Sequence, residues 1–202
     1  MAKRSYTSKV RTVAAQETRA AVLRAARQLF EEQGYAKTTV AGIAEQAGVA
    51  LNTVYTSVGG KPGLLAALVA ESADDALIQS TLDDVLGSSD GRDILHRTAE
   101  GTGTITRQHE TILNLLHDNA NADPVVTAAA ESADKIYRAR LEQTAQHLVT
   151  LNAVRTDQSH TADILWFYFG RSGWRAVREL GWDWPECTTW LTDQASSALL
   201  PR

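Results

Sequence analysis

The sequence has very few of the residues that build disulfide frameworks, cysteine-rich metal sites or β-rich folds. It contains one cysteine, Cys187, among 202 residues, which excludes an intramolecular disulfide and a multi-cysteine zinc site. No histidine lies near this cysteine in "DWPECTTW", so we interpret its thiol as packed and unreactive. Only four prolines interrupt the chain, and no stretch alternates β-branched residues in the way that predicts strands.

Long apolar runs are also missing. No run of about 18 apolar residues is present, which argues against a membrane-spanning helix. The first residues, "MAKRSYTSKVRTVAAQETR", lack the apolar centre of a secretory signal. We therefore expect a cytoplasmic protein with no membrane partner.

Negative charge prevails in the chain as a whole, with a formal net charge of −4, but it is unevenly distributed. Residues 1–63 hold nine lysines and arginines against four acids, and the remainder holds eleven against twenty. This asymmetry predicts a basic module that contacts a polyanion, followed by an acidic body with another task. The alternative is a chance segregation of solvated charges.

Apolar residues recur at spacings of three and four, which predicts an all-α protein. The predicted first helix ends at Gly34, a residue typical of the left-handed position after a helix. Asp123 and Asp183 are predicted N-caps, with Pro124 and Pro185 in the first turns of their helices, and Glu186 completes a capping box after Asp183. The predicted helices cover residues 17–33, 61–86, 93–120, 123–151, 161–180 and 184–200.

Residues 38–61, "TTVAGIAEQAGVALNTVYTSVGGK", have the spacing of a helix-turn-helix. Gly48 falls at the turn, where the backbone needs a positive φ. Ala44 falls where the two helices cross, a position at which a larger side chain would force them apart. The apolar contacts between the helices come from Ile43, Ala47, Val49 and Val54.

Further residues in a fixed order surround this hairpin, and the segment from 17 to 68 thereby resembles the TetR (tetracycline repressor-like) family of transcription regulators. These residues are Gly34 with Tyr35, Thr38 with Thr39, Tyr55, Gly60 with Lys61, and Leu64 with Leu65. The chain departs from the family pattern at three positions. Ala50 replaces the usual Ser or Thr that opens the recognition helix, Val58 replaces an aromatic residue, and Pro62 replaces an acid.

The resemblance implies a homodimer that binds a palindromic double-stranded operator, usually as a repressor, and whose body binds a small-molecule effector. It implies an N-terminal three-helix domain with the helix-turn-helix, followed by a larger helical effector-binding and dimerisation domain. We assign a basic flexible arm to residues 1–16, the DNA-binding domain to 17–63 and the body to 64–202. The arm residues Lys3, Arg4, Lys9 and Arg11 either follow the DNA backbone or form a solvated tail.

The predicted recognition helix carries no charge, which is compatible with DNA binding because phosphate contacts supply most of the affinity and base edges supply the specificity. We expect Asn52 and Thr53 to reach base edges and Leu51 to lie against a thymine methyl. The predicted phosphate ligands are Thr39, Tyr55, Thr56 and Lys61. The alternatives are a core role for Tyr55 and a helix-capping role for Thr38 or Thr39.

All five tryptophans fall within residues 161–200, and this aromatic surface exceeds what one short helix pair buries. We predict a symmetric dimer interface there, a four-helix bundle through Trp166, Gly170, Gly173 and Val177; the alternative is packing within one chain. An apolar or aromatic effector is expected among the middle helices. Its candidate contacts are Gln108, Asn114, His117, Tyr137, Trp166 and Tyr168. The alternative for each is a side chain that is solvated or has its hydrogen bonds satisfied locally.

No catalytic loop, nucleophile motif or di-iron pattern is present, so we expect no enzyme, no cofactor and no metal site. Asp93 with His96, and Asp157 with His160, have ligand-like spacing but fit a surface pair and loop polarity better. Two rival classes remain. One is a helical small-molecule-binding or interaction protein without DNA binding, and the other, less favoured, is a cofactor-free enzyme.

Overall fold

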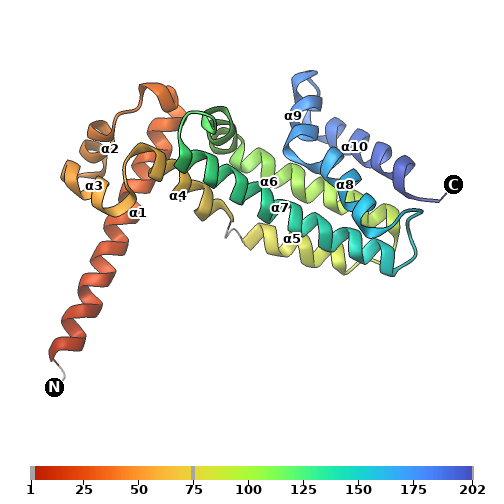
Figure 1. The fold of residues 1–202 in the computed structure, drawn as a ribbon, viewed down its shortest axis with the longest axis horizontal. Coiled ribbons are helices and arrows are strands. Elements are labelled where there is room, and N and C mark those ends of the chain that lie inside the picture. Colours follow the sequence, from red (N-terminus) through yellow and green to blue (C-terminus); the bar gives the residue numbers. More distant parts are fainter. Residues whose placement is uncertain (1–2, 74–75, 202) are drawn as a thin grey trace. The chain divides into compact units, whose positions relative to one another are not determined.

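Ten α-helices and no strand make up the residues that the computed structural model describes, which are 3–73 and 76–201 for the backbone and 12–72 and 76–201 for the side chains (Figure 1). The predicted all-α class is confirmed. Within these described ranges, none of the helices is both long and apolar enough to span a bilayer. The helices are α1 (Lys3–Lys37), α2 (Val40–Ala47), α3 (Leu51–Val58), α4 (Lys61–Ala73), α5 (Ala76–Leu86), α6 (Gly91–Asn119), α7 (Pro124–Thr150), α8 (Gln158–Phe169), α9 (Arg171–Glu179) and α10 (Trp184–Leu199).

The first helix is longer than predicted. It begins at Lys3, whereas the sequence predicts a flexible arm over residues 1–16. The physical reason is that residues 3–33 contain neither proline nor glycine and are rich in alanine, glutamine, glutamate and arginine, which favour helices. The side chains of the four basic arm residues lie outside the described residues. As predicted, the regular helix ends at Gly34, where φ is +80°.

One predicted long helix is interrupted. Along the predicted helix over 61–86 the structure describes α4 to Ala73 and α5 from Ala76, and residues 74–75 lie outside the described part of the chain. The prediction over 161–180 is wrong, because Gly170 adopts an extended backbone (φ −71°, ψ 169°) between α8 and α9. A Cβ atom on Gly170 would lie 2.3 Å from the Trp166 carbonyl oxygen, so this break requires glycine. The three other long predictions correspond to α6, α7 and α10.

The chain forms two compact units that do not follow a single cut in the sequence. Unit 1 comprises Met1–Ser72 and Thr111–Ala130, and unit 2 comprises Ala73–Glu110 and Glu131–Arg202. Helices α6 and α7 therefore contribute residues to both units.

The core of unit 1 joins the helix-turn-helix to α1 and α4. Phe30, Ile43 and Val54 are almost fully buried, and α4 adds Leu64 and Leu68. Helix α1 packs against both α2 and α3. The helix-turn-helix thus rests on one apolar face of α1, and its outer face remains free of this core.

The core of unit 2 takes residues from all six of its helices. The apolar side chains of α8, α9 and α10 pack on those of α5, α6 and α7, and Trp174 is the largest of the fully buried ones. Its Nε1 donates to Thr102 Oγ1 at 3.2 Å, which satisfies the indole inside the core. The members are Val85, Ile94, Leu95, Ala99, Leu141, Ala145, Leu148, Ala162, Leu165, Phe169, Trp174, Val177, Cys187, Leu191, Ala195 and Leu199.

Candidate nucleic-acid interface

The turn between α2 and α3 has the geometry that the sequence predicts. Gly48 has φ +67°, and its N–H donates to the carbonyls of Ala44 and Glu45. The Val49 N–H also donates to the Ala44 carbonyl, at 3.0 Å. Ile43 and Ala44 on α2 and Val54 on α3 are buried. The two short helices are therefore held at a fixed angle by a left-handed glycine and a small apolar contact.

The outer face of α3 is polar, exposed and uncharged. Leu51 is 46% exposed and Tyr55 is 51% exposed, and Asn52 and Thr56 are also exposed. Thr53 is half-buried. Ala50 precedes the helix without a capping hydrogen bond from its side chain, as the departure from the family pattern predicts. An amide, a hydroxyl, a phenol and an apolar side chain are thus presented together on one helix.

The threonines before α2 have structural partners. Thr39 Oγ1 accepts from the Gly42 N–H at 3.0 Å and caps α2, which is the alternative named for this residue. Thr38 is buried, and its hydroxyl donates to the carbonyls of Leu29 and Gly34. These bonds connect the end of α1 to the start of the helix-turn-helix.

Tyr55 lies at the surface and not in the core. Its ring packs against Gly60, where a Cβ atom would come 3.2 Å from the Tyr55 Cε1 atom. Gly60 also has a positive φ of +96°. Glycine is therefore required here both by the backbone conformation and by the space that the Tyr55 ring occupies. The exposed phenol of Tyr55 is therefore held in place by the turn that follows α3.

Lys61 points into unit 1. Its Nζ donates to the Tyr35 carbonyl and, at 3.0 Å, to the Thr38 carbonyl. It also lies 4.3 Å from the centroid of the Tyr35 ring. Burial lowers the pKa of its ammonium group. This placement differs from the predicted contact with a DNA phosphate.

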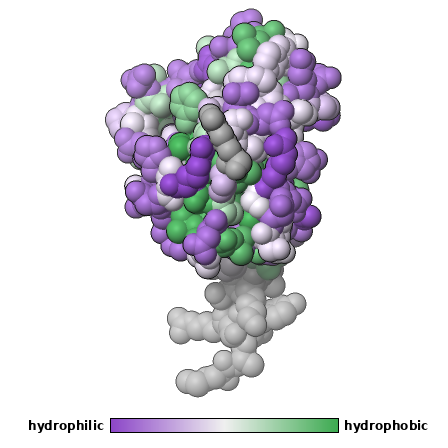
Figure 2. Space-filling model, turned by 90° about the vertical axis from the view of Figure 1, so that its right-hand side faces the viewer, coloured by the Kyte–Doolittle hydropathy of each residue, from purple (hydrophilic) through white to green (hydrophobic). Residues whose placement is uncertain are grey.

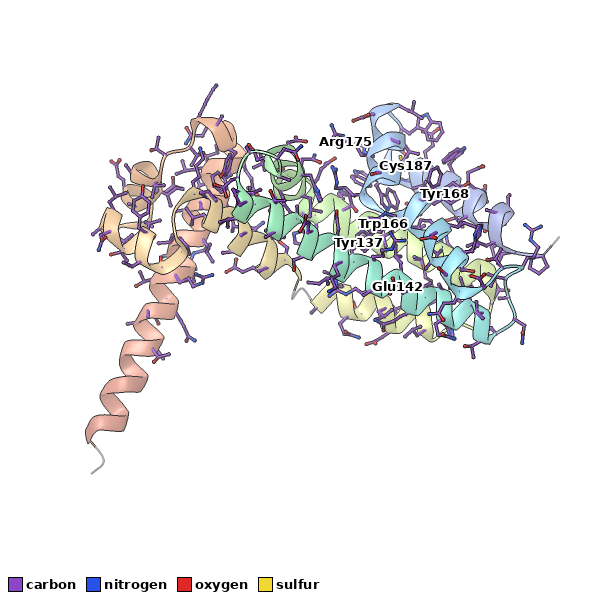
Figure 3. The ribbon with its side chains drawn as sticks, in the orientation of Figure 1. Tyr137, Glu142, Trp166, Tyr168, Arg175 and Cys187 are labelled. Carbon is purple, nitrogen blue, oxygen red and sulfur yellow. The ribbon has the colours of Figure 1, made fainter. Side chains whose placement is uncertain are left out.

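The six predicted effector contacts are divided between the two units. Asn114 and His117 belong to unit 1, and Gln108 is exposed on α6. Tyr137 on α7 and Trp166 on α8 lie together, with ring centroids 5.7 Å apart (Figure 3). The half-buried ring of Tyr168 packs edge-on against its neighbour Phe167.

Sequence reasoning missed Thr102, a polar residue next to this aromatic pair. The Tyr137 hydroxyl donates to the Phe169 carbonyl and is enclosed near Thr102, so burial raises its pKa above the usual value. Thr102 in turn accepts from Trp174. The sequence signal was the spacing of Thr98 and Thr102, which places two buried hydroxyls on the apolar face of α6.

The predicted interface residues serve their own chain. Val177 is 4% exposed and belongs to the core of unit 2. A Cβ atom on Gly173 would lie 2.2 Å from the Tyr168 carbonyl oxygen, so its small size is needed within the chain. Trp166 is half-buried between Tyr137 and the Arg138 guanidinium. Val177 is thus packed inside its own chain, and the dimer role of these residues stays a prediction.

Other apolar side chains of unit 2 are exposed. Phe167 is 70% exposed on α8, Leu180 is 65% exposed after α9, and Trp190 is 39% exposed on α10. These helices contact one another. Apolar patches lie among hydrophilic residues on the face of the molecule that Figure 2 shows.

Both carboxylate-histidine spacings have structural explanations. Asp93 pairs with Arg97 at 2.7 Å, and His96 lies 3.5 Å from Glu100. Asp157 caps α8 by accepting from the His160 N–H. In the part of the chain that the structure describes, no three histidines, cysteines or acids are grouped as metal ligands.

Comparison with known proteins agrees with this geometry. A family model for bacterial regulatory proteins of the tetR family matches residues 22–68. The HTH-type transcriptional regulator TtgR of Pseudomonas putida is 46% identical over 55 residues. The match covers 27% of this chain and 26% of that protein, so the chain spans about a quarter of the length of the curated relatives it matches.

Solved structures share the fold over nearly the whole chain. A protein from Saccharomonospora viridis, described as a transcriptional regulator and bound to choline, has a TM-score of 0.75 at 16% identity, covering 93% of this chain and 100% of that one. The transcriptional regulator FadR from Bacillus subtilis, bound to stearoyl-CoA, has a TM-score of 0.70 at 15% identity and covers 87% and 96% of the two chains. At these identities the likeness shows the fold alone. The tetR family model thus matches the helix-turn-helix segment of this chain, residues 22–68, and the chain as a whole shares the fold of these solved structures.

Proposed function

We propose that the chain is a homodimeric transcriptional regulator that binds a palindromic DNA operator through α3. The observation that carries this proposal is the outer face of α3, where Leu51, Asn52 and Tyr55 are exposed while Val54 anchors the opposite face in the core. A helix of this kind fits the major groove, where an amide suits adenine and an apolar side chain suits the thymine methyl. The tetR family model covers this helix.

Charge around α3 supplies the affinity that the helix itself lacks. The first 63 residues carry an excess of positive charge, and Arg24 and Lys37 are exposed basic residues of α1. Binding driven by such residues releases counterions and weakens steeply with salt. Thr56 and Tyr55 are the exposed hydroxyls of α3 that we assign to phosphates.

The test is selection of duplexes from random DNA by the purified full chain, followed by titration over a range of salt. Enrichment of a palindrome with half-sites about one helical turn apart, ~34 Å, supports the proposal. Failure to enrich any duplex at low salt, with or without candidate ligands, would leave the rival interpretation of a helical binding protein that does not bind DNA.

Asn52→Ala is expected to weaken operator binding by about 1–3 kcal/mol and to relax selectivity at one base position, because the amide makes a bidentate contact there. The measurement is fluorescence anisotropy with duplexes changed one position at a time. Gln33→Ala, which removes an exposed amide from α1, is the matched control. Equal loss of affinity for every duplex would contradict a base contact by Asn52.

We further propose that the protein acts as a repressor and that a small molecule bound in unit 2 releases it from DNA. Two proteins of similar fold are bound to choline and to stearoyl-CoA, so the fold accepts ligands of different chemistry. In this chain the aromatic pair Tyr137 and Trp166, which lie together on α7 and α8, suits an apolar or aromatic effector. A ligand that binds the DNA-free conformation more tightly than the DNA-bound one lowers the affinity for the operator. The size of the decrease is set by the ratio of the two ligand affinities.

Phe167→Asp is expected to raise the dissociation constant of the proposed homodimer about 30-fold or more, since truncating a central aromatic anchor costs about 2 kcal/mol or more. Phe167 is the most exposed of the large apolar side chains that the structure describes, so the change spares the core. Sedimentation equilibrium measures the effect. Ile136→Asp on α7, also exposed, is the control, and equal effects of both changes would contradict an interface at Phe167.

A further inference from the structure

Two cationic side chains of unit 1 reach across the fold to carbonyl oxygens at helix ends. Arg19 on α1 donates from Nη1 to the Ser57 carbonyl at 2.7 Å, in the last turn of α3. Lys61, the first residue of α4, donates to the carbonyls of Tyr35 and Thr38 at the end of α1 and just before α2. Each bond joins segments that are more than twenty residues apart in the sequence.

Such bonds have a clear physical basis. The last carbonyls of a helix lack intrahelical partners, and the helix dipole makes that end negative. A lysine or arginine placed there satisfies the carbonyls and the dipole together. Lys61 loses hydration in this position, as the direction of its pKa change indicates, and the carbonyls and the Tyr35 ring replace the lost water contacts.

The two side chains act at opposite ends of the helix-turn-helix. Thr38 immediately precedes the cap of α2, and Ser57 lies near the end of α3. From α3 the chain passes through Gly59 and Gly60, both with positive φ, directly to Lys61. The exit from α3 is therefore tied to α1, and the end of α1 and the entry into α2 are tied to the first residue of α4.

We propose that Arg19 and Lys61 are positioning residues that fix the angle at which α3 meets DNA, and that neither contributes a phosphate contact. This inference rests on the proposed function and assigns a different role to Lys61 from the one that its position in the family pattern implies. The positive charge that attracts DNA then belongs to other basic residues, such as Lys37.

The test compares Lys61→Met and Arg19→Met with the parent protein at a temperature well below unfolding. Methionine keeps most of the stem and removes the donors. Affinity for the selected operator is expected to fall about tenfold, while affinity for a random duplex and the slope of log affinity against log salt stay unchanged. Lys61→Arg, which keeps donors at this position, is expected to restore most of the specificity.

Lys37→Met is the control for loss of a positive charge, because Lys37 is exposed at the end of α1. If Lys61→Met reduced the slope of log affinity against log salt by the amount of one phosphate contact and weakened both duplexes equally, Lys61 would be a phosphate ligand. That result would overturn the proposal. If both methionine variants kept the specificity of the parent, the two residues would only stabilise the fold. That result would also overturn the proposal.

Hydrogen exchange of the free protein separates this inference from the proposed function. Faster exchange of the α2 and α3 amides in Lys61→Met than in Lys37→Met is expected whether or not DNA binds. If the parent binds no duplex, the proposed function fails, and the exchange experiment alone decides whether the two side chains hold these helices. Equal exchange in the two variants would refute the positioning role.

Discussion

Trp174→Ala is expected to lower the free energy of unfolding of unit 2 by about 3–5 kcal/mol, the range for truncating a buried aromatic side chain. Trp174 is fully buried, and its ring lies 5.8 Å from that of Trp184. A Cβ atom on Gly103 would come 2.6 Å from the Trp174 Cη2 atom, so α6 approaches the indole too closely for any other residue at 103. The truncation also leaves Thr102 without its indole donor.

Urea unfolding followed by circular dichroism measures this change. Trp190→Ala is the control, because Trp190 is partly exposed on α10 and its removal leaves no internal cavity. Trp174→Phe fills most of the space but lacks the N–H group, and we expect a loss of about 1 kcal/mol or more from the hydrogen bond. Equal destabilisation by Trp174→Ala and Trp190→Ala would contradict the central position assigned to Trp174.

Gly63→Ala is expected to destabilise unit 1 by about 1–3 kcal/mol or more, whereas a glycine-to-alanine change inside a helix ordinarily stabilises by about 0.4–1 kcal/mol. The sign reverses because a Cβ atom at position 63 would lie 1.7 Å from the Val58 carbonyl oxygen. That oxygen belongs to the backbone at the end of α3, so α3 and α4 must separate to admit a methyl group. We therefore expect operator binding to weaken as well.

Thermal unfolding and anisotropy with the selected operator check these two consequences. Gly42→Ala is the control in the same unit, because a Cβ atom there would lie 3.3 Å from a single side-chain oxygen, Thr39 Oγ1. Its expected effect stays within about 1 kcal/mol. A stabilised Gly63→Ala variant would show that the start of α4 does not press against α3.

The features predicted correctly from the sequence depend on neighbours within a few residues. Gly34 and Gly48 are left-handed because helices end there, and Asp183 caps α10 through a bond to a residue three positions away. The helix break at Gly170 was not predicted, because it depends on the close approach of the Trp166 carbonyl. The spacing of apolar residues in the sequence carries no information on that contact. The partners of Lys61 lie 23 and 26 residues earlier in the chain, and only the folded unit brings them to its ammonium group.

Tryptophan fluorescence reports on unit 2 alone. All five lie in unit 2, at positions 166, 174, 182, 184 and 190, and unit 1 has none. Indole emission therefore follows the unfolding or ligand loading of unit 2 and is insensitive to the opening of α2 and α3. When an emission curve and an ellipticity curve coincide during denaturation, the two units unfold together, and when they separate, each unit has its own stability.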